Sequence, residues 1–373
     1  MAQTAKQESN LMNELYIGLM SGTSIDGIDA ALVDFSQKNP RLIDSHYLPY
    51  TTDFRKRILD LCYPGEDEIN RLGEVDVLLG KQFANATQNL LQKNQLTAKN
   101  IRAIGCHGQT IRHHPARRFT LQIGDPNIIA AETNITTIAD FRRRDIAWGG
   151  QGAPLVPAFH QAIFSANTNR AIVNIGGIAN VTLLPANNKT ILGFDTGPGN
   201  TLLDAWAEKY LQQPQDHQGK WGSQGVIQQN LLSAMLADSF FQQSPPKSTG
   251  REYFNLSWLK SFSPENYQPV DVQATLTELT AQSIMHAVKP QFLSGEILIC
   301  GGGVHNEFLL QRLRKLADHY AIESTEQYGV HPDWVEAMAF AWLAKQTLAG
   351  QPGNFTAVTG AKQPSILGGV YFT

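Results

Sequence analysis

Residues 15 to 35, LYIGLMSGTSIDGIDAALVDF, decide how the fold begins. Two apolar runs flank a turn that carries glycine, serine and threonine, which is typical of two strands joined as a β-hairpin. Residues 41–50, RLIDSHYLPY, supply a third strand. A helix over residues 66–94 and short strands at 101–108 and 136–141 follow. This alternation indicates an α/β architecture.

The same pattern starts again in the second half of the chain. Residues 170–185, RAIVNIGGIANVTLLP, read as strand, glycine turn and strand, and residues 190–195, TILGFD, read as a third strand. The expected later elements are helices at 200–212, 225–242, 271–288 and 332–349, and a strand, three glycines and a helix at 296–316. Because 373 residues exceed one ordinary core, we expect two like domains that face each other across a cleft.

The predicted domain boundaries follow this repeat. Residues 15–145 form the first domain, which residues 346–373 complete, and residues 146–345 form the second domain. Residues 1–14 are polar and lack the apolar stretch of a signal peptide, so we expect them to form a flexible tail.

The composition argues against several classes of protein. With 42% hydrophobic and 17% charged residues the chain is globular, and a formal net charge of -3 argues against a nucleic-acid partner. No run reaches the about 18 apolar residues of a membrane span. Three scattered cysteines fit a reducing compartment better than a disulfide framework or a zinc site, so we expect a cytoplasmic protein that binds no membrane.

Glycine-rich turns are the candidate phosphate sites. The first hairpin turn lacks the lysine of a Walker A loop, but successive N–H groups in a glycine turn can hold an anion. A plain hairpin that needs glycine for positive φ is the alternative. Since both hairpins open a domain, together they suggest a triphosphate clamped between the domains. The three glycines after residue 300 can approach adenine or phosphate, although a packing turn explains them equally well. The candidate nucleotide-binding residues are Gly22, Thr23, Ser24, Ile25, Asp26, Gly27, Ile28, Asp29, Gly176, Gly177, Asn180, Gly301, Gly302 and Gly303.

Asp195, in the stretch GFDTGPGN (193–200), is the candidate base. It ends an apolar strand, where a carboxylate has no packing role and where α/β folds place function. Asn200 is a good N-cap for the helix that follows, and a nearby helix N-terminus favours an ionised carboxylate. The alternative is a structural aspartate that only caps the helix.

Basic and histidine-rich segments give weaker signals. FRRRD (141–145) and RHHPARRF (112–119) are typical of solvated surface, and recognition of a small anion is the alternative. His107, His113 and His114 lack a known zinc spacing. We expect His107, directly after a buried strand, to form a hydrogen bond in a cleft and to contact the substrate.

Several segments resemble a known family. The hairpin-first plan with two domains resembles the actin, sugar-kinase and heat-shock-chaperone ATPase superfamily, and the sequence is similar to the anhydro-N-acetylmuramic acid kinase family. The resemblance implies two RNase H-like (actin-like ATPase) domains. The matching segments are GLMSGTSIDGIDAALVDF, IGCHGQTIRHHP, LQIGDP, ADFRRRDIAWGGQGAPLVPAFH, VNIGGIANVT, GFDTGPGN, KSTGREYFN, CGGGVHN and EAMAFAWLA.

The resemblance also implies an activity. The family converts 1,6-anhydro-N-acetylmuramic acid, with ATP, Mg²⁺ and water, into N-acetylmuramic acid 6-phosphate during peptidoglycan recycling. By this resemblance Asp195 activates the water, O6 of the sugar takes the γ-phosphoryl group, and residues 22–29 hold the ATP phosphates. Arg144, Glu336 and His107 fall at the sugar, whose lactyl carboxylate suits an arginine.

The magnesium ligands depart from the pattern of the wider superfamily. Many members place an aspartate just before the first glycine turn, where this chain has Met20 and Ser21, and the corresponding residue of the second hairpin is Asn174. Asp26 and Asp195 are therefore the predicted metal ligands.

Two other functions stay open at this point. A chaperone or filament subunit on the same fold predicts an appended domain or polymer-contact insertions, which 373 residues do not show. A metal-dependent member would use His107 and His113. The expected partner is a small sugar, and the resemblance is compatible with a homodimer.

Overall fold

The computed structural model describes residues 14–22, 24–37, 39–186, 190–245 and 247–373. These form two compact units. Unit 1 contains the described residues up to Phe159 together with Trp334–Thr373, and unit 2 contains His160–Asp333. Residues 1–13 of the predicted tail, and the candidate phosphate residue Thr23, lie outside the described residues.

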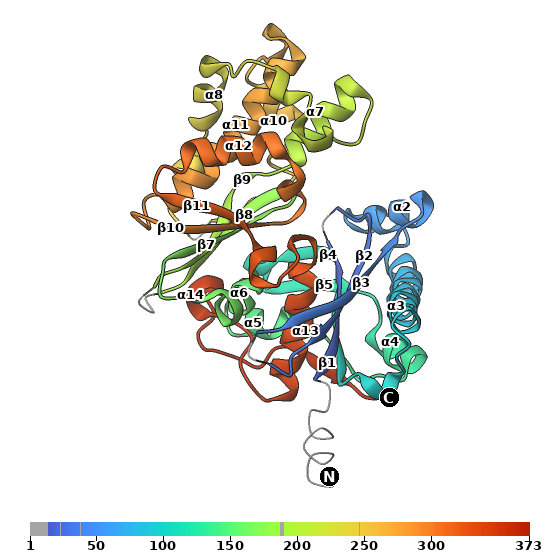
Figure 1. Ribbon diagram of the computed structural model, residues 1–373. Coiled ribbons are helices and arrows are strands. Elements are labelled where there is room, and N and C mark those ends of the chain that lie inside the picture. Colours follow the sequence, from blue (N-terminus) through green and yellow to red (C-terminus); the bar gives the residue numbers. More distant parts are fainter. Residues whose placement is uncertain (1–13, 23, 38, 187–189, 246) are drawn as a thin grey trace. The chain divides into compact units, whose positions relative to one another are not determined.

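Unit 1 is built on a mixed sheet that begins with the predicted hairpin (Figure 1). Its strand order is β12-β6-β4-β1-β2-β3, and β5 pairs with β4. The hairpin is antiparallel, with Leu15 opposite Asp34 and Met20 opposite Asp29, whereas β4 and β6 join in parallel. The strands are β1 (Leu15–Ser21), β2 (Gly27–Asp34), β3 (Arg41–Pro49), β4 (Ala103–His114), β5 (Phe119–Ile123), β6 (Thr137–Ala139) and β12 (Gly369–Tyr371).

Helices cover both faces of this sheet. Side chains alternate along β1, so Ile17 and Leu19 join the core that includes Phe83 of α3, whereas Gly18 faces α13. The helices of unit 1 are α2 (Thr52–Leu61), α3 (Glu68–Lys93), α4 (Pro126–Thr133), α5 (Arg143–Ala147), α13 (Val335–Leu348) and α14 (Thr356–Thr359), and α6 (Val156–Phe164) runs across the boundary to unit 2.

The packing of α13 moves the predicted domain boundaries. We expected residues 146–345 to form the second domain, but residues 146–159 and 334–345 belong to unit 1. The reason is a close approach between α13 and two strands. A Cβ on Gly18 would overlap the Ala337 carbonyl, and a Cβ on Gly105 would overlap the Phe340 carbonyl. The two glycines thus let an almost wholly apolar helix lie directly on the sheet.

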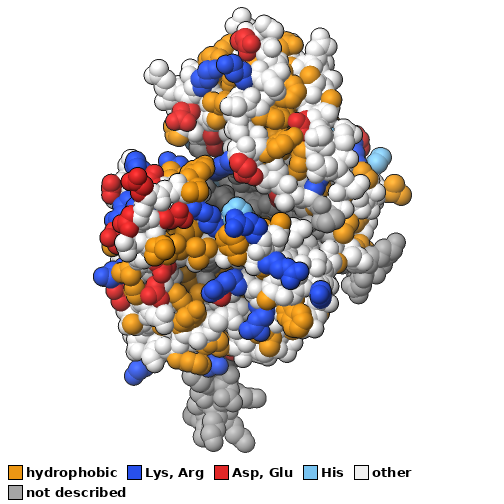
Figure 2. Space-filling view, turned by 180° about the vertical axis from the view of Figure 1, so that it is seen from behind, with side chains coloured by type: hydrophobic (Ala, Val, Ile, Leu, Met, Phe, Trp, Pro, Cys, Tyr) orange, Lys and Arg blue, Asp and Glu red, His pale blue; other side chains and the backbone are white. Residues whose placement is uncertain are grey.

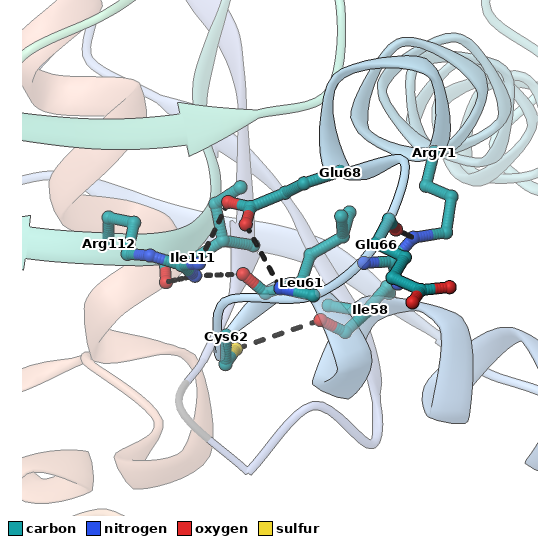
Figure 3. A network of polar contacts seen from close by, with 9 residues as sticks. Ile58, Leu61, Cys62, Glu66, Glu68, Arg71, Ile111 and Arg112 are labelled. Atoms are coloured by element: carbon teal, nitrogen blue, oxygen red, sulfur yellow. Dashed lines mark hydrogen bonds and ion pairs between the residues drawn. The ribbon is translucent and has the colours of Figure 1, made fainter.

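A polar contact fixes α2 and α3 to the sheet of unit 1 (Figure 3). Arg112 of β4 donates to Glu68 at the start of α3, at 2.8 Å, and to the carbonyl of Leu61 at the end of α2. The half-buried guanidinium therefore links three elements. This arginine of the RHHPARRF cluster has a structural role.

Unit 2 repeats the strand order of unit 1. Its sheet runs β11-β10-β7-β8-β9, which corresponds to β6-β4-β1-β2-β3, again with an antiparallel hairpin first and parallel strands beyond it. The predicted duplication is therefore present in the topology, and it confirms the expected fold class of two α/β domains that each open with a hairpin. The strands are β7 (Arg170–Ile175), β8 (Ile178–Leu184), β9 (Leu192–Pro198), β10 (Gly295–Cys300) and β11 (Tyr320–Ser324).

Two apolar cores stabilise unit 2. One lies between the sheet and helices α11 and α12, and the other joins α7, α8, α10 and α11 around Trp206 and Phe254. The predicted helix 225–242 is divided, because Asp238 caps a separate short helix by accepting from the N–H of Phe240 at 2.8 Å. The helices are α7 (Thr201–Leu211), α8 (Gln229–Leu236), α9 (Ser239–Gln242), α10 (Leu256–Lys260), α11 (Pro269–Val288) and α12 (Glu307–Leu316).

The surface carries charges of both signs. On the face drawn in Figure 2, Lys and Arg side chains share the surface with Asp and Glu side chains, and apolar side chains lie between them. Such a mixed face agrees with the small net charge of -3. Among the described residues, no helix has both the length and the apolar character needed to cross a membrane.

Candidate active site

Asp195 lies within an edge strand of unit 2. It stands opposite Asn180 of β8, and β9 continues beyond it to Pro198, so the expectation that Asp195 ends its strand was wrong. The exposed edge of β9 is covered by a later segment. The Asp195 N–H donates to the carbonyl of Lys247 at 3.1 Å, and Oδ2 of Asp195 accepts from the Thr249 N–H at 2.9 Å. One carboxylate oxygen is thereby held in place by the backbone.

Burial sets the protonation of this carboxylate. It raises the pKa of Asp195 to about 6, while the Thr249 N–H lowers the pKa and the charge of Glu252 raises it. We expected the N-terminus of the next helix to favour the ionised form. That helix, α7, begins at Thr201, beyond the end of the strand, and burial outweighs any such effect. A carboxylate with this pKa can take a proton near neutral pH.

The second hairpin turn, Gly176–Gly177, is fixed to the start of α7. Its two carbonyls accept from the N–H groups of Gly199, Asn200 and Thr201 at 2.8–3.0 Å. Asn200 occupies the N-cap position, but its side chain makes no capping hydrogen bond and instead donates to the Ile175 carbonyl at 3.1 Å. The predicted capping role of Asn200 was therefore wrong, because its amide ties the helix to the hairpin.

The triple glycine follows β10 and borders a cavity. Gly301 has a φ of 76° and lies so close to Asn174 that a Cβ would overlap its side-chain oxygen. Gly302 begins a short 3₁₀ turn, η6 (Gly302–His305), and α12 follows it. The cavity has a volume of about 470 Å³. It is lined by Asn200, Leu203, Asp204, Gln215, Asp216, His217, Gln218, Gly302, Val304, His305, Asn306 and Glu307.

The first hairpin turn, in unit 1, is partly exposed to solvent. Ser24 donates to the exposed Asp26 carboxylate at 2.9 Å, and Ile25 has a φ of 52° with its side chain buried. Arg55 of α2 supports the turn by donating to the carbonyls of Ile25 at 3.0 Å and Ser24 at 3.3 Å. Of the other candidates in this segment, Ile28 is fully buried in the core, so its side chain is not available to a ligand. The turn presents polar groups of Ser24 and Asp26 to solvent.

His107 and Arg142 form a buried pair in unit 1. Arg142 donates to Nε2 of His107 from Nε at 3.0 Å and from Nη2 at 2.9 Å, and Nη1 donates to the Gly152 carbonyl at 2.7 Å. Nδ1 of His107 lies 2.8 Å from the Gly108 carbonyl, which fits a neutral ring that donates from Nδ1. Burial, and then the charge of Arg142, keep the pKa of His107 well below 6.5.

Arg142 is the inward-facing arginine of FRRRD. Burial lowers the pKa of Arg142 to about 10, while the charges of Glu336 and Asp145 raise it. Burial raises the pKa of Glu336, and Arg142 lowers it. Arg144 is exposed and Arg143 pairs with Asp140 at 2.7 Å. Arg142 and Asp145 lie three residues apart on one face of the turn, and Asp145 is fully buried, so the tertiary fold decides which arginine faces inward.

The histidines proposed for a metal site have other partners. Both ring nitrogens of His107 are in hydrogen-bond contact, and Nδ1 of His113 lies 3.0 Å from the Thr120 hydroxyl. Within the part of the chain that the structure describes, no three His, Cys, Asp or Glu side chains are grouped as a metal site. Cys62 and Cys106 are free thiols.

Sequence comparisons with known proteins agree on one family. The sequence profile of the anhydro-N-acetylmuramic acid kinase family matches residues 14–373. A protein of that name from Coxiella burnetii (strain Dugway 5J108-111) is 52% identical over 365 residues, which cover 96% of this chain and 98% of the relative. Another, from Saccharophagus degradans, is 52% identical over 366 residues, with the same coverage of 96% and 98%. Among solved structures, an activator of 2-hydroxyisocaproyl-CoA dehydratase from Clostridium difficile gives a TM-score of 0.45 at 14% identity, over 90% of this chain and 97% of that one.

Proposed function

The chain belongs to the anhydro-N-acetylmuramic acid kinase family, and on this basis we propose how its residues carry out the family reaction. The enzyme phosphorylates 1,6-anhydro-N-acetylmuramic acid in cell-wall recycling. Water adds to the anomeric carbon, the bond from that carbon to O6 breaks, and O6 takes the γ-phosphoryl group of ATP. The products are N-acetylmuramic acid 6-phosphate and ADP.

Asp195 is the base in this proposal, and its environment is the observation that carries it. The Thr249 N–H holds Oδ2, and among the described residues no other hydrogen bond reaches the carboxylate. The second oxygen can therefore accept a proton from water as that water attacks the anomeric carbon. A pKa of about 6 leaves the carboxylate ionised at neutral pH and basic enough to take the proton.

The glycine turns of the two hairpins and the triple glycine are the proposed ATP-binding segments. In unit 2 the cavity beside Gly302 is large enough for a nucleoside, and the close backbone at Gly301 allows a flat base to approach. In unit 1 the described turn residues, Gly22 and residues 24–26, are the proposed phosphate contacts. Mg²⁺, usually held by one or two carboxylates together with phosphates, would be held by Asp26 or Asp195 and would neutralise phosphate charge.

The sugar is recognised by polar side chains of unit 1. Arg144 is exposed and suits the lactyl carboxylate of the substrate. Glu336, next to Arg142, can accept a hydrogen bond from a sugar hydroxyl, and His107, whose ring nitrogens contact Arg142 and the Gly108 carbonyl, positions the arginine beside the sugar. An enzyme that consumes ATP and carries free thiols at Cys62 and Cys106 suits the cytoplasm, and a homodimer is the proposed assembly.

An isotope experiment tests the reaction. Turnover in ¹⁸O-labelled water should place one label on the anomeric oxygen of the product and none in the phosphate, which mass spectrometry of the sugar and of released phosphate can separate. Label in the phosphate, or phosphorylation without opening of the anhydro bridge, would contradict the proposed sequence of steps. A reaction without ATP serves as the control for uncatalysed opening.

A further inference from the structure

The segment Lys247–Glu252, KSTGRE, covers the edge of β9 beside Asp195. The Lys247 carbonyl accepts from the Asp195 N–H at 3.1 Å, and the Thr249 N–H reaches the Asp195 carboxylate at 2.9 Å. The segment ends in two charged side chains, those of Arg251 and Glu252. Arg251 is the one whose position suggests a ligand.

The Arg251 guanidinium lies against the glycine turn of the second hairpin. A Cβ placed on Gly177 would lie 2.9 Å from Nη2 and 3.0 Å from Nε of Arg251, so the guanidinium covers the space that a side chain at position 177 would fill. The side chain of Arg251 is exposed, and within the described part of the chain it forms no hydrogen bond or ion pair. Its five N–H donors are available to an anion.

The glycine turn beside Arg251 adds further donors. The carbonyls of Gly176 and Gly177 are used by the N–H groups of Gly199, Asn200 and Thr201. The N–H groups of Gly176 and Gly177 donate to no residue that the structure describes. Carbonyls that are engaged and N–H groups that are free make the turn attractive to an anion.

Arg251 also lies close to the wall of the nucleoside cavity. Asp204, in the first turn of α7, lines that cavity. Burial raises the pKa of Asp204 to about 7, and the positive charge of Arg251 lowers it, so the two side chains are near enough to interact. The turn, the arginine and the cavity therefore belong to one neighbourhood of unit 2.

We propose that Arg251 binds phosphate oxygens of ATP at the Gly176–Gly177 turn and neutralises charge on the phosphates during transfer. The inference rests on the proposed kinase function. Phosphoryl transfer depends mainly on positioning and on cations near the phosphate oxygens, and a planar guanidinium can bind two of those oxygens together. The lactyl carboxylate of the sugar offers similar chemistry, but the free N–H groups of the turn and the adjoining cavity favour phosphate.

The test measures nucleotide affinity apart from turnover. In Arg251→Ala, calorimetry should find the affinity for ATP lowered about tenfold to hundredfold, the size of one charge-assisted contact, and the affinity for adenosine unchanged. The kcat with the sugar should fall about hundredfold, and added guanidinium ion should restore part of it. Arg251→Lys keeps the charge without the planar fork and should fall between wild type and Arg251→Ala. Arg314→Ala, which removes an exposed arginine of α12, is the matched control and should behave as wild type.

Three outcomes would overturn the assignment. Equal ATP affinity and equal kcat in wild type and Arg251→Ala would remove Arg251 from the site. A loss of sugar affinity with unchanged ATP affinity would assign Arg251 to the carboxylate instead. An equal loss of ATP and adenosine affinity, with a lowered melting temperature, would indicate a structural role. Should wild type fail to turn over the sugar, the proposed function fails, but the comparison of ATP with adenosine still decides the role of Arg251.

Discussion

The third strands of the two sheets, β3 and β9, occupy the same place in the same strand order, and each carries an aspartate. Asp44 of β3 is opposite Leu32, far along β2 from the hairpin turn, whereas Asp195 of β9 is opposite Asn180, close to the turn. Burial alone would raise the pKa of Asp44, but hydrogen bonds from Lys93, from the Ser45 N–H and from Asn94 lower it below its ordinary value.

Asp195 differs from Asp44 in the segment that covers its strand. The segment after Lys247 lies along the edge of β9, supplies one backbone N–H to the carboxylate, and provides no cation to it among the described residues. Burial therefore dominates and raises the pKa of Asp195 to about 6. Equivalent edge strands thus hold one carboxylate whose pKa is lowered and one whose pKa is raised to about 6, so that it can exchange a proton near neutral pH. The covering segment, and not the sheet topology, makes the difference.

The largest expected effect is on turnover. Asp195→Asn keeps the shape of the side chain and removes the proposed base, so kcat should fall about 10³-fold or more while ATP affinity survives. Asp44→Asn is the matched control, with the same chemical change on the equivalent strand, and should leave kcat within about twofold. Both values come from steady-state assays of sugar phosphorylation with calorimetry of ATP binding. Substantial residual activity in Asp195→Asn would contradict the assigned base.

The pH dependence of kcat gives the next effect. Water can be activated only by the ionised carboxylate, so kcat of the wild type should fall about tenfold for each pH unit below about 6. A rate measured with a saturating sugar concentration from pH 4.5 to pH 8 should show this limb. A kcat that stays level down to pH 4.5 would mean that Asp195 does not titrate as the base.

Stability should depend on pH with opposite signs at the two strands. The pKa of Asp195 is raised from 3.8 to about 6, so its contribution is present below the unfolded value and is lost as the pH rises through about 6. Asp195→Asn should therefore become more stable than wild type between pH 4 and pH 8, by up to about 3 kcal/mol. The pKa of Asp44 is lowered, so its contribution is present above 3.8 and is lost as the pH falls.

Asp44→Asn should accordingly be less stable than wild type at pH 7, and the difference should shrink towards pH 3. Thermal melts of both variants across this range provide the measurement. If both variants change stability in the same direction with pH, the contrast between the strands is not electrostatic. A sugar-free, nucleotide-free buffer keeps ligand binding out of the comparison.

Much of the fold could be predicted from the sequence because its signals are local. Both hairpins combine apolar runs with glycine turns, and these patterns were enough to predict their repetition. The position of α13 could not be predicted, since an apolar helix shows no preferred face. Its partners, Gly18 and Gly105, come much earlier in the chain.

The candidate site, like the fold, could be predicted only in part from the sequence. Asp195 stood out because a carboxylate followed an apolar run, but the segment after Lys247 acts through backbone N–H and carbonyl groups, which carry no sequence signature. In FRRRD the choice among arginines depended on which side of a short helix is buried, and the structure places Arg142 there. Residue types were therefore readable, while their electrostatic environments required the tertiary fold.

The smallest expected effect comes from removing the cation of β3. Lys93, the last residue of α3, donates to Asp44 at 2.7 Å and to the Ser45 carbonyl at 3.2 Å, but its side chain is 56% exposed. Lys93→Met should lower the free energy of unfolding by about 0.5 kcal/mol, because exposed ion pairs are weak, and the loss should shrink in 1 M salt, where charges are screened at about 3 Å. The substitution should also raise the pKa of Asp44, because burial raises this pKa and the lysine that lowers it is gone. Carbon-detected NMR of the carboxyl can follow the change. Turnover should not change, because a raised pKa of Asp44 on β3 does not alter Asp195, the proposed base near the second hairpin. A fall in kcat would show that the two third strands are not independent, and the contrast between them would have to be rebuilt on that coupling.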